Sequence, residues 1–161
     1  MRDLIARLRG DLFRLRARLL RRRITAGPGL RIYRAFRSYG PGTVRIGSNC
    51  RIDGIRGDDS QYVCIDTLRP DASVVIGDDA RLYGARIAAK YQVTIGDAFL
   101  IEEAAVVDTD FHSIERGRQD PPNESREGCA ISIGNRVCIG ARSCVLKGVC
   151  IGDDVVVAPG S

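Results

Sequence analysis

The chain has 161 residues, a length typical of one compact domain. Aromatic residues make up only 6% of it and 18 residues are glycine, whereas 44% hydrophobic and 28% charged residues exclude a disordered chain. No apolar run reaches the roughly 18 residues of a membrane-spanning helix, and the N-terminus lacks the apolar stretch of a signal peptide. Six cysteines are too few for a disulfide scaffold, so we expect a cytoplasmic protein with reduced thiols.

The positive charge is concentrated in residues 1–24. This segment has nine arginines and two aspartates, a charge of +7 against +5 for the whole chain, so the remainder sums to −2 and offers no surface for nucleic acid. Apolar residues at helical spacing from Leu4 to Leu20 predict a basic amphipathic helix, although Gly10 weakens the pattern. Three roles stay open: packing on its own domain or a neighbouring subunit, peripheral contact with an anionic membrane, and nucleic-acid binding, for which the evidence is weak.

A six-residue period runs through the rest of the chain. An aliphatic residue recurs at Ile133, Ile139, Val145, Ile151 and Val157, and earlier at Ile46, Ile52, Ile76, Ile95 and Ile101. Such a unit provides one short strand and one tight corner, and a glycine after the aliphatic residue lets the backbone turn where a Cβ would crowd. Three units close a coil of about 18 residues, and coils stack at about 4.8 Å.

This pattern resembles the left-handed parallel β-helix of the hexapeptide-repeat acyltransferases. The resemblance covers residues 43–161 and implies an all-β, left-handed parallel β-helix of about six coils. Its handedness comes from the resemblance alone, because such coils are an exception to the right-handed crossover rule. We expect the N-terminal helix at residues 1–24 and a linker that enters the β-helix at 25–42.

Three cysteines follow the same period. Cys138, Cys144 and Cys150 each precede an inward aliphatic residue, so we expect them to point outward on three successive faces of the prism. Groups on different faces cannot share one zinc ion, and no CxxC motif or histidine cluster indicates a metal site. The expectation is therefore no metal, with these cysteines as packing residues.

The period is interrupted between Val107 and Ile133, which predicts an extruded loop at about 108–132. The loop carries His112, the one histidine of the chain. Composition alone favours a solvated histidine. However, Asp108, Asp110 and His112 alternate, so in an extended chain two carboxylates would flank the imidazole and raise its basicity, as a general base requires.

The segments DTDFHSI and ISIGNRVCIGARSCVLKGVCIGDDVVV resemble sugar O-acetyltransferases, especially those that modify bacterial surface polysaccharides. The resemblance implies that His112 takes a proton from an acceptor hydroxyl, whose oxygen attacks the thioester of acetyl-CoA directly. Asp110 or Asp108 would orient the imidazole, and backbone N–H groups would stabilise the oxyanion. It also implies a homotrimer with each site between two prisms and acetyl-CoA, the co-substrate, along the C-terminal coils.

The cofactor-binding positions of that family are matched only in part. Ala141 matches a position whose backbone contacts pantetheine, and Arg142 and Lys147 are candidates for the CoA phosphates or, equally, solvated corners. Cys138 stands where galactoside-type relatives have tryptophan. Pro159 stands where they place an amide donor for CoA, and proline has no N–H.

Two classes of function follow. The first is a CoA-dependent O-acetyltransferase acting on a sugar hydroxyl of a surface-polysaccharide precursor. The basic helix would then hold this enzyme at the inner face of the cell membrane. The second is a non-catalytic trimeric scaffold that binds membrane or a partner through this helix. The end at Ser161, where relatives continue into a C-terminal cap, favours the scaffold. Serine acetyltransferases carry a larger helical N-terminal domain, and a γ-type carbonic anhydrase needs three histidine ligands.

Overall fold

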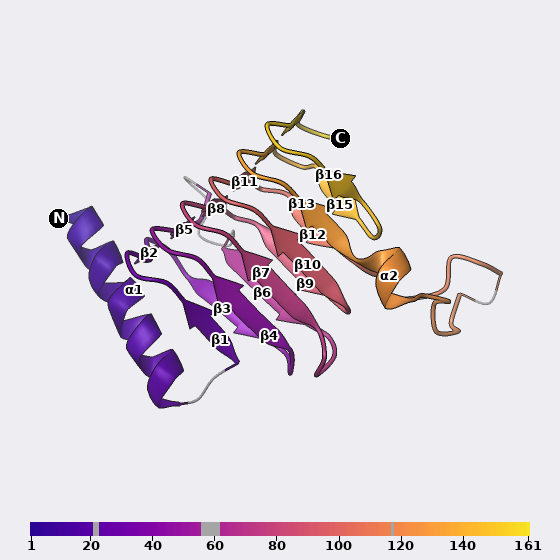
Figure 1. Cartoon of the computed structure of the whole chain (residues 1–161), viewed down its shortest axis with the longest axis horizontal. Coiled ribbons are helices and arrows are strands. Elements are labelled where there is room, and N and C mark those ends of the chain that lie inside the picture. Colours follow the sequence, from indigo (N-terminus) through magenta and orange to yellow (C-terminus); the bar gives the residue numbers. More distant parts are fainter. Residues whose placement is uncertain (21–22, 56–61, 117) are drawn as a thin grey trace.

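The computed structural model describes residues 1–161 except 21–22, 56–61 and 117. The described chain is a left-handed parallel β-helix with one N-terminal helix and one short helical turn in a loop (Figure 1). Its strands form three sheets, which are the three faces of a prism. No helix in these residues is both long and apolar enough to cross a bilayer.

Each turn of the chain adds one strand to each sheet. Sheet A contains β1 (Ile24–Ala26), β4 (Thr43–Ile46), β7 (Ser73–Ile76), β10 (Gln92–Ile95), β13 (Ile131–Ile133) and β16 (Cys150–Ile151). Sheet B contains β2 (Arg31–Ile32), β5 (Arg51–Asp53), β8 (Arg81–Tyr83), β11 (Leu100–Glu102), β14 (Cys138–Ile139) and β17 (Val156–Val157). Sheet C contains β3 (Phe36–Tyr39), β6 (Val63–Thr67), β9 (Arg86–Ala89), β12 (Ala105–Val107) and β15 (Cys144–Leu146).

The inward positions stack in register from coil to coil. Val44 pairs with Val74, Val74 with Val93, and Val93 with Ile131, and all four side chains are buried. Such columns of isoleucine, valine, leucine and alanine form the narrow core that the six-residue period predicts. The strands give five full coils and part of a sixth, close to the expected six, but the first coil precedes residue 43, so residues 43–161 form four full coils and part of a fifth.

The β-helix begins earlier than the sequence pattern indicates. Residues 25–42 form most of the first coil, since β1 pairs with β4 and β2 with β5, so the expectation of a linker is wrong. Ile24, Leu30 and Ile32 are buried as inward residues of this coil. The period is hidden there because this corner lacks the isoleucine–glycine pair that marks the later coils.

Close stacking at the corner after sheet A requires the repeated glycines. A Cβ on Gly77 would lie 2.6 Å from the carbonyl carbon of Gly96, one coil further on. Beside the glycines, side chains link successive coils: the N–H of Asp78 donates to Asp97 Oδ1 at 2.7 Å, and that of Asp97 to Asn135 Oδ1 at 2.9 Å. The corner therefore combines the absence of a side chain with a ladder of hydrogen bonds.

Helix α1 (Arg2–Leu19) covers the open end of the first coil (Figure 1). It packs on β1 and β2 with its small residues Ala6, Gly10 and Ala17, which are buried. A Cβ on Gly10 would lie 2.7 Å from the carbonyl carbon of Leu30, so glycine is what permits the close approach. The leucines that predict the helix in the sequence are mostly exposed and face away from the prism.

Candidate active site

The extruded loop leaves the prism after β12 and returns at β13 (Figure 1). Its last turn is the short helix α2 (Arg126–Cys129), which Ser125 caps by accepting a hydrogen bond from the N–H of Gly128 at 3.1 Å. The returning end is thus built from a defined turn. The outgoing end is held by charged side chains.

Asp108 is fully buried at the base of the loop. Its carboxylate accepts three backbone hydrogen bonds, from the N–H groups of Lys90 at 2.5 Å, Tyr91 at 2.8 Å and Gln92 at 2.6 Å. These three residues lie at the corner between β9 and β10. Asp108 therefore holds the start of the loop against this corner. The Asp108 carboxylate therefore bonds to the backbone at this corner, and in the described residues it makes no hydrogen bond to His112.

Glu124 is the residue around which the loop is anchored, and its side chain has no exposed surface. Its Oε2 lies 2.7 Å from Lys90 Nζ, and its Oε1 accepts the N–H of Asp110 at 2.7 Å. The carboxylate of Asp110 pairs with the ammonium of Lys147, whose Nζ is also 3.7 Å from Glu124 Oε1. We call Lys90, Asp110, Glu124 and Lys147 the loop anchor.

The loop anchor is a compensated set of charges. Burial raises the pKa of Glu124, but hydrogen bonds from Lys90, the backbone of Asp110 and Thr109 outweigh it and hold this pKa below its ordinary value. The hydrogen bond to Glu124 raises the pKa of Lys90, and that to Asp110 raises the pKa of Lys147. These shifts favour the charged forms of Lys90, Lys147 and Glu124 at neutral pH, so loss of one partner would leave another charge at the loop base uncompensated.

His112 lies beyond the anchor on the exposed part of the loop. Phe111 has a φ of +63°, which turns the chain, so the extended alternation expected for Asp108, Asp110 and His112 does not occur. Within the described chain neither carboxylate contacts the imidazole. Its Nδ1 instead lies 3.0 Å from the carbonyl oxygen of Ser113. A carbonyl can only accept, so this bond requires the proton on Nδ1 and leaves the lone pair on Nε2.

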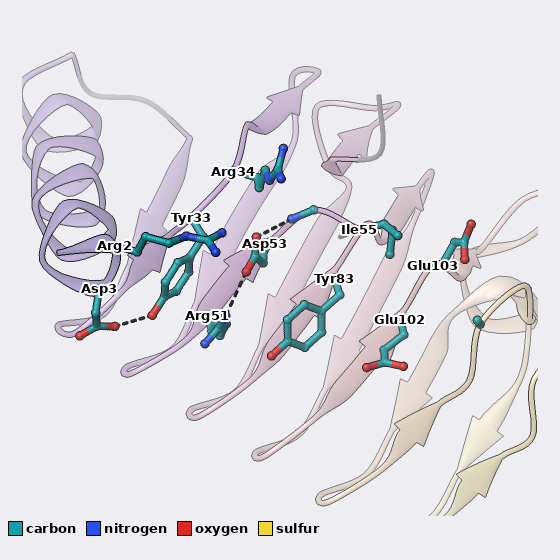
Figure 2. A pocket seen from close by; sticks show the side chains of 12 residues that line it. Arg2, Asp3, Tyr33, Arg34, Arg51, Asp53, Ile55, Tyr83, Glu102 and Glu103 are labelled. Carbon is teal, nitrogen blue, oxygen red and sulfur yellow. Dashed lines mark hydrogen bonds and ion pairs between the residues drawn. The ribbon is translucent and has the colours of Figure 1, made fainter. Parts of the chain in front are cut away.

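A groove of about 670 Å³ runs along the outer surface of sheet B, from the start of α1 to Ala141 (Figure 2). Tyr33, Arg51 and Tyr83 follow one another across three coils, and the Arg51 guanidinium lies 4.0 Å from the centre of the Tyr33 ring and 5.6 Å from that of Tyr83. Asp53 pairs with Arg51 at 3.0 Å. The groove thus combines aromatic faces with charged groups, as sites for polar ligands do.

The remaining candidate residues are divided between the groove and the loop. Ala141 lines the groove, and its carbonyl accepts the N–H of Gly160 at 2.9 Å. Arg142 is exposed at the same corner with a φ of +61°, and Pro159 is exposed beside Gly140. Lys147 pairs with Asp110 in the loop anchor, so its ammonium group is already neutralised and is not free to bind a CoA phosphate. Among its described lining residues the groove has Ala141 but none from the loop, so His112 does not line it within one chain.

The outward cysteines lie where the period places them. Cys138 is in sheet B and half-buried, Cys144 is in sheet C and Cys150 in sheet A, both exposed, which confirms three different faces. In the residues that the structure describes, no group of three or more histidine, cysteine, aspartate or glutamate side chains could hold a metal ion.

Sequence reasoning misses Glu124 and Lys90. Glu124 lies in a polar stretch without periodicity, and its partner Lys90 is 34 positions away, so no local pattern joins them. One signal was available: Lys90 begins a corner between two strands with buried aliphatic residues, and no acidic residue lies within six positions of it.

Residues 130–161 match the family model described as "Hexapeptide repeat of succinyl-transferase". The match includes strands β13 to β17 and so falls on the part of the prism beyond the loop. No curated protein and no solved structure gives a significant match. Together with the three-sheet prism, the matched segment supports a relationship with the hexapeptide-repeat acyltransferases and, at a coarse level, a transferase.

Proposed function

We propose that the protein is a CoA-dependent O-acetyltransferase that moves an acetyl group from acetyl-CoA to a sugar hydroxyl of a surface-polysaccharide precursor. The observation that carries this proposal is His112: it stands on an anchored loop with Nδ1 bonded to the Ser113 carbonyl, which leaves Nε2 able to accept a proton. The matched segment supports the transferase class, and the acceptor class follows from the resemblance of the loop sequence.

The proposed reaction has one base and no acyl-enzyme. Nε2 of His112 accepts the proton of the acceptor hydroxyl while its oxygen attacks the thioester carbonyl of acetyl-CoA. The tetrahedral intermediate, stabilised by N–H donors, expels the CoA thiolate, which takes the proton back from the imidazolium. The Ser113 carbonyl, rather than Asp110 or Asp108, is the group that orients the imidazole, because it accepts from Nδ1. The two aspartates act indirectly, by holding the loop.

We propose that the site is completed by a second chain in a homotrimer. His112 lies outside the groove of its own chain, and its neighbours Phe111 and Ile114 are 59% and 68% exposed. Exposed apolar side chains beside a catalytic group fit contact with a neighbouring prism. Ala141 and Arg142 then border the pantetheine and phosphate side of the groove, and the co-substrate acetyl-CoA places the reaction in the cytoplasm.

The first experiment is calorimetric titration of acetyl-CoA into the purified protein, followed by transfer of labelled acetyl groups to a panel of sugar acceptors. We expect His112→Ala to bind acetyl-CoA normally but to lose about 10²–10⁴-fold in rate, the usual contribution of a general base. Glu127→Ala, at an exposed position of the same loop, is the matched control and should keep wild-type rates.

A loss of only a few-fold in His112→Ala would contradict the proposed base. The competing function is a non-catalytic trimeric scaffold, and one observation favours it: within the described residues His112 has no carboxylate partner. A folded trimer that binds no acetyl-CoA would decide for the scaffold.

A further inference from the structure

The outer face of α1 is an apolar surface without a partner in this chain. Its residues share the side of the helix that faces away from the prism and are Leu4, Ile5, Leu8, Leu12, Leu15 and Leu19, between 42% and 73% exposed. The buried small residues Ala6, Gly10 and Ala17 lie on the opposite side, since successive residues of a helix are about 100° apart. We call this row of six the leucine stripe.

Arginines border the leucine stripe on both sides. Arg2, Arg9 and Arg16, spaced by seven, follow one border, and Arg7, Arg14 and Arg18 follow the other. The two acidic residues of the helix pair with two of these six arginines, Asp3 with Arg7 at 2.9 Å and Asp11 with Arg14 at 3.3 Å, which leaves a net charge of +4 along the borders. An apolar strip between two cationic borders matches the chemistry of an acidic lipid surface, with acyl chains below and phosphates at their edge.

A second cavity supports the same ligand chemistry. A groove of about 480 Å³ lies between α1 and the first coil, directly beside Leu12 of the leucine stripe. Its lining includes Phe13 and Phe36, in contact at 5.3 Å between ring centres, together with the cationic Arg9 and Arg16. A lining of both apolar and cationic side chains suits an acidic phospholipid, with its acyl chain on the apolar residues and its phosphate on the arginines.

We infer that α1 binds the surface of an anionic lipid bilayer, lying in the interface with the leucine stripe among the acyl chains and the bordering arginines on the phosphates. Two other occupants fit less well. A second copy of α1 would place arginine borders against arginine borders, and nucleic acid would leave the apolar strip uncovered. The inference stands independently of the proposed catalytic function.

Tryptophan fluorescence tests this directly, because the chain has no tryptophan of its own. We expect the emission of Leu12→Trp to move to shorter wavelength when vesicles of phosphatidylcholine with 30% phosphatidylglycerol are added, but not with phosphatidylcholine alone. The matched control is Leu146→Trp in β15, since Leu146 and Leu12 are 54% and 47% exposed. Its emission should not change.

Vesicle sedimentation separates the apolar and electrostatic parts. Leu8→Gln combined with Leu15→Gln, and separately Arg16→Gln combined with Arg18→Gln, should each weaken partitioning about tenfold or more, and salt should weaken it further. These side chains are exposed, so circular dichroism and the unfolding temperature should be unchanged. Absence of binding by the folded protein, or equal binding to neutral vesicles, would overturn the inference. A smaller native mass for the leucine variant would overturn it in favour of pairing between helices.

Discussion

Glu124 shows how a single side chain positions an irregular segment. The loop that bears His112 has few ladder hydrogen bonds, and a buried carboxylate with partners at Lys90, Thr109 and Asp110 takes their place. A buried carboxylate is costly unless fully paired, so removal of its charge leaves Lys90 without its partner. The same carboxylate sets the position of Lys147 through Asp110.

The loop anchor predicts a dependence of stability on pH. The pKa of Glu124 is lower in the folded than in the unfolded chain, so its contribution is complete above the ordinary glutamate pKa and is lost as pH falls through the lower, folded value. We expect Glu124→Gln to lower the free energy of unfolding by about 1.5–3 kcal/mol at pH 7, the range for hydrogen bonds to charged groups. The deficit should shrink below about pH 4.

Thermal unfolding at pH 7 and pH 3.5 measures this change. Glu127→Gln, at an exposed site in α2, is the control and should match the wild type at both pH values. A deficit of Glu124→Gln that is the same at both pH values would contradict the role of its charge.

At the scale of the elements, the hydrogen-bonded strands set the distance between coils, and the corner after sheet A must fit within that distance. The strands have only two to five residues, and each gains its stability from the coils above and below. At the corner after sheet A a side chain would enter the space of the next coil. Glycine at this corner therefore permits the close stacking that the strands require.

Two equivalent glycines provide a matched test. A Cβ on Gly77 would lie 2.6 Å from the backbone of Gly96, whereas one on Gly152, in the last coil, has nothing within 4 Å. We expect Gly77→Ala to destabilise the protein by about 1–3 kcal/mol, the usual cost of overpacking. Gly152→Ala should be neutral or slightly stabilising. Chemical denaturation of both variants measures the difference, and equal effects would show that the corner tolerates a Cβ.

The sequence predicts the prism better than its attachments. Inward residues recur every six positions because each must occupy the same column, so the core and the point at which the loop leaves the prism can be read from the period, whereas the first coil cannot. The orientation of α1 could not, because hydrophobic patterning favours the leucines, whereas contact is decided by how closely Ala6 and Gly10 let two backbones approach. The loop anchor could not either, since Lys90 and Glu124 meet only after folding.

At the scale of the whole molecule, the proposed catalytic groups belong to different parts of the surface. His112 is on the loop, and Ala141 borders the groove on sheet B, so a shared site needs two chains. In a trimer with parallel prism axes every chain would contribute one loop and one groove, and all three α1 helices would lie at the same end. Three membrane contacts on one face would bind far more tightly than one.

Mixed trimers test the shared site. We expect a native mass of about three times the 17.6 kDa of one chain. His112→Ala lacks the base and Ala141→Trp fills the groove, so each homotrimer should be inactive. Refolded together in equal amounts, the two chains should recover about a quarter of wild-type activity, because a quarter of random neighbouring pairs join an intact loop to an intact groove. No recovery, with mixed trimers present, would place the whole site in one chain.

Because the coils stack at a regular spacing, the number of coils sets distances along the prism axis. Each coil raises the chain by about 4.8 Å, so the height of a side chain above α1 is set by the number of coils beneath it. The loop leaves after the fourth coil, about 14 Å above the first. If α1 lies on a bilayer, this count decides how far a lipid-linked sugar must extend from its headgroup to meet His112. The protein would then accept only lipid-linked sugars long enough to span the distance from the bilayer to His112, before any side chain contacts the sugar.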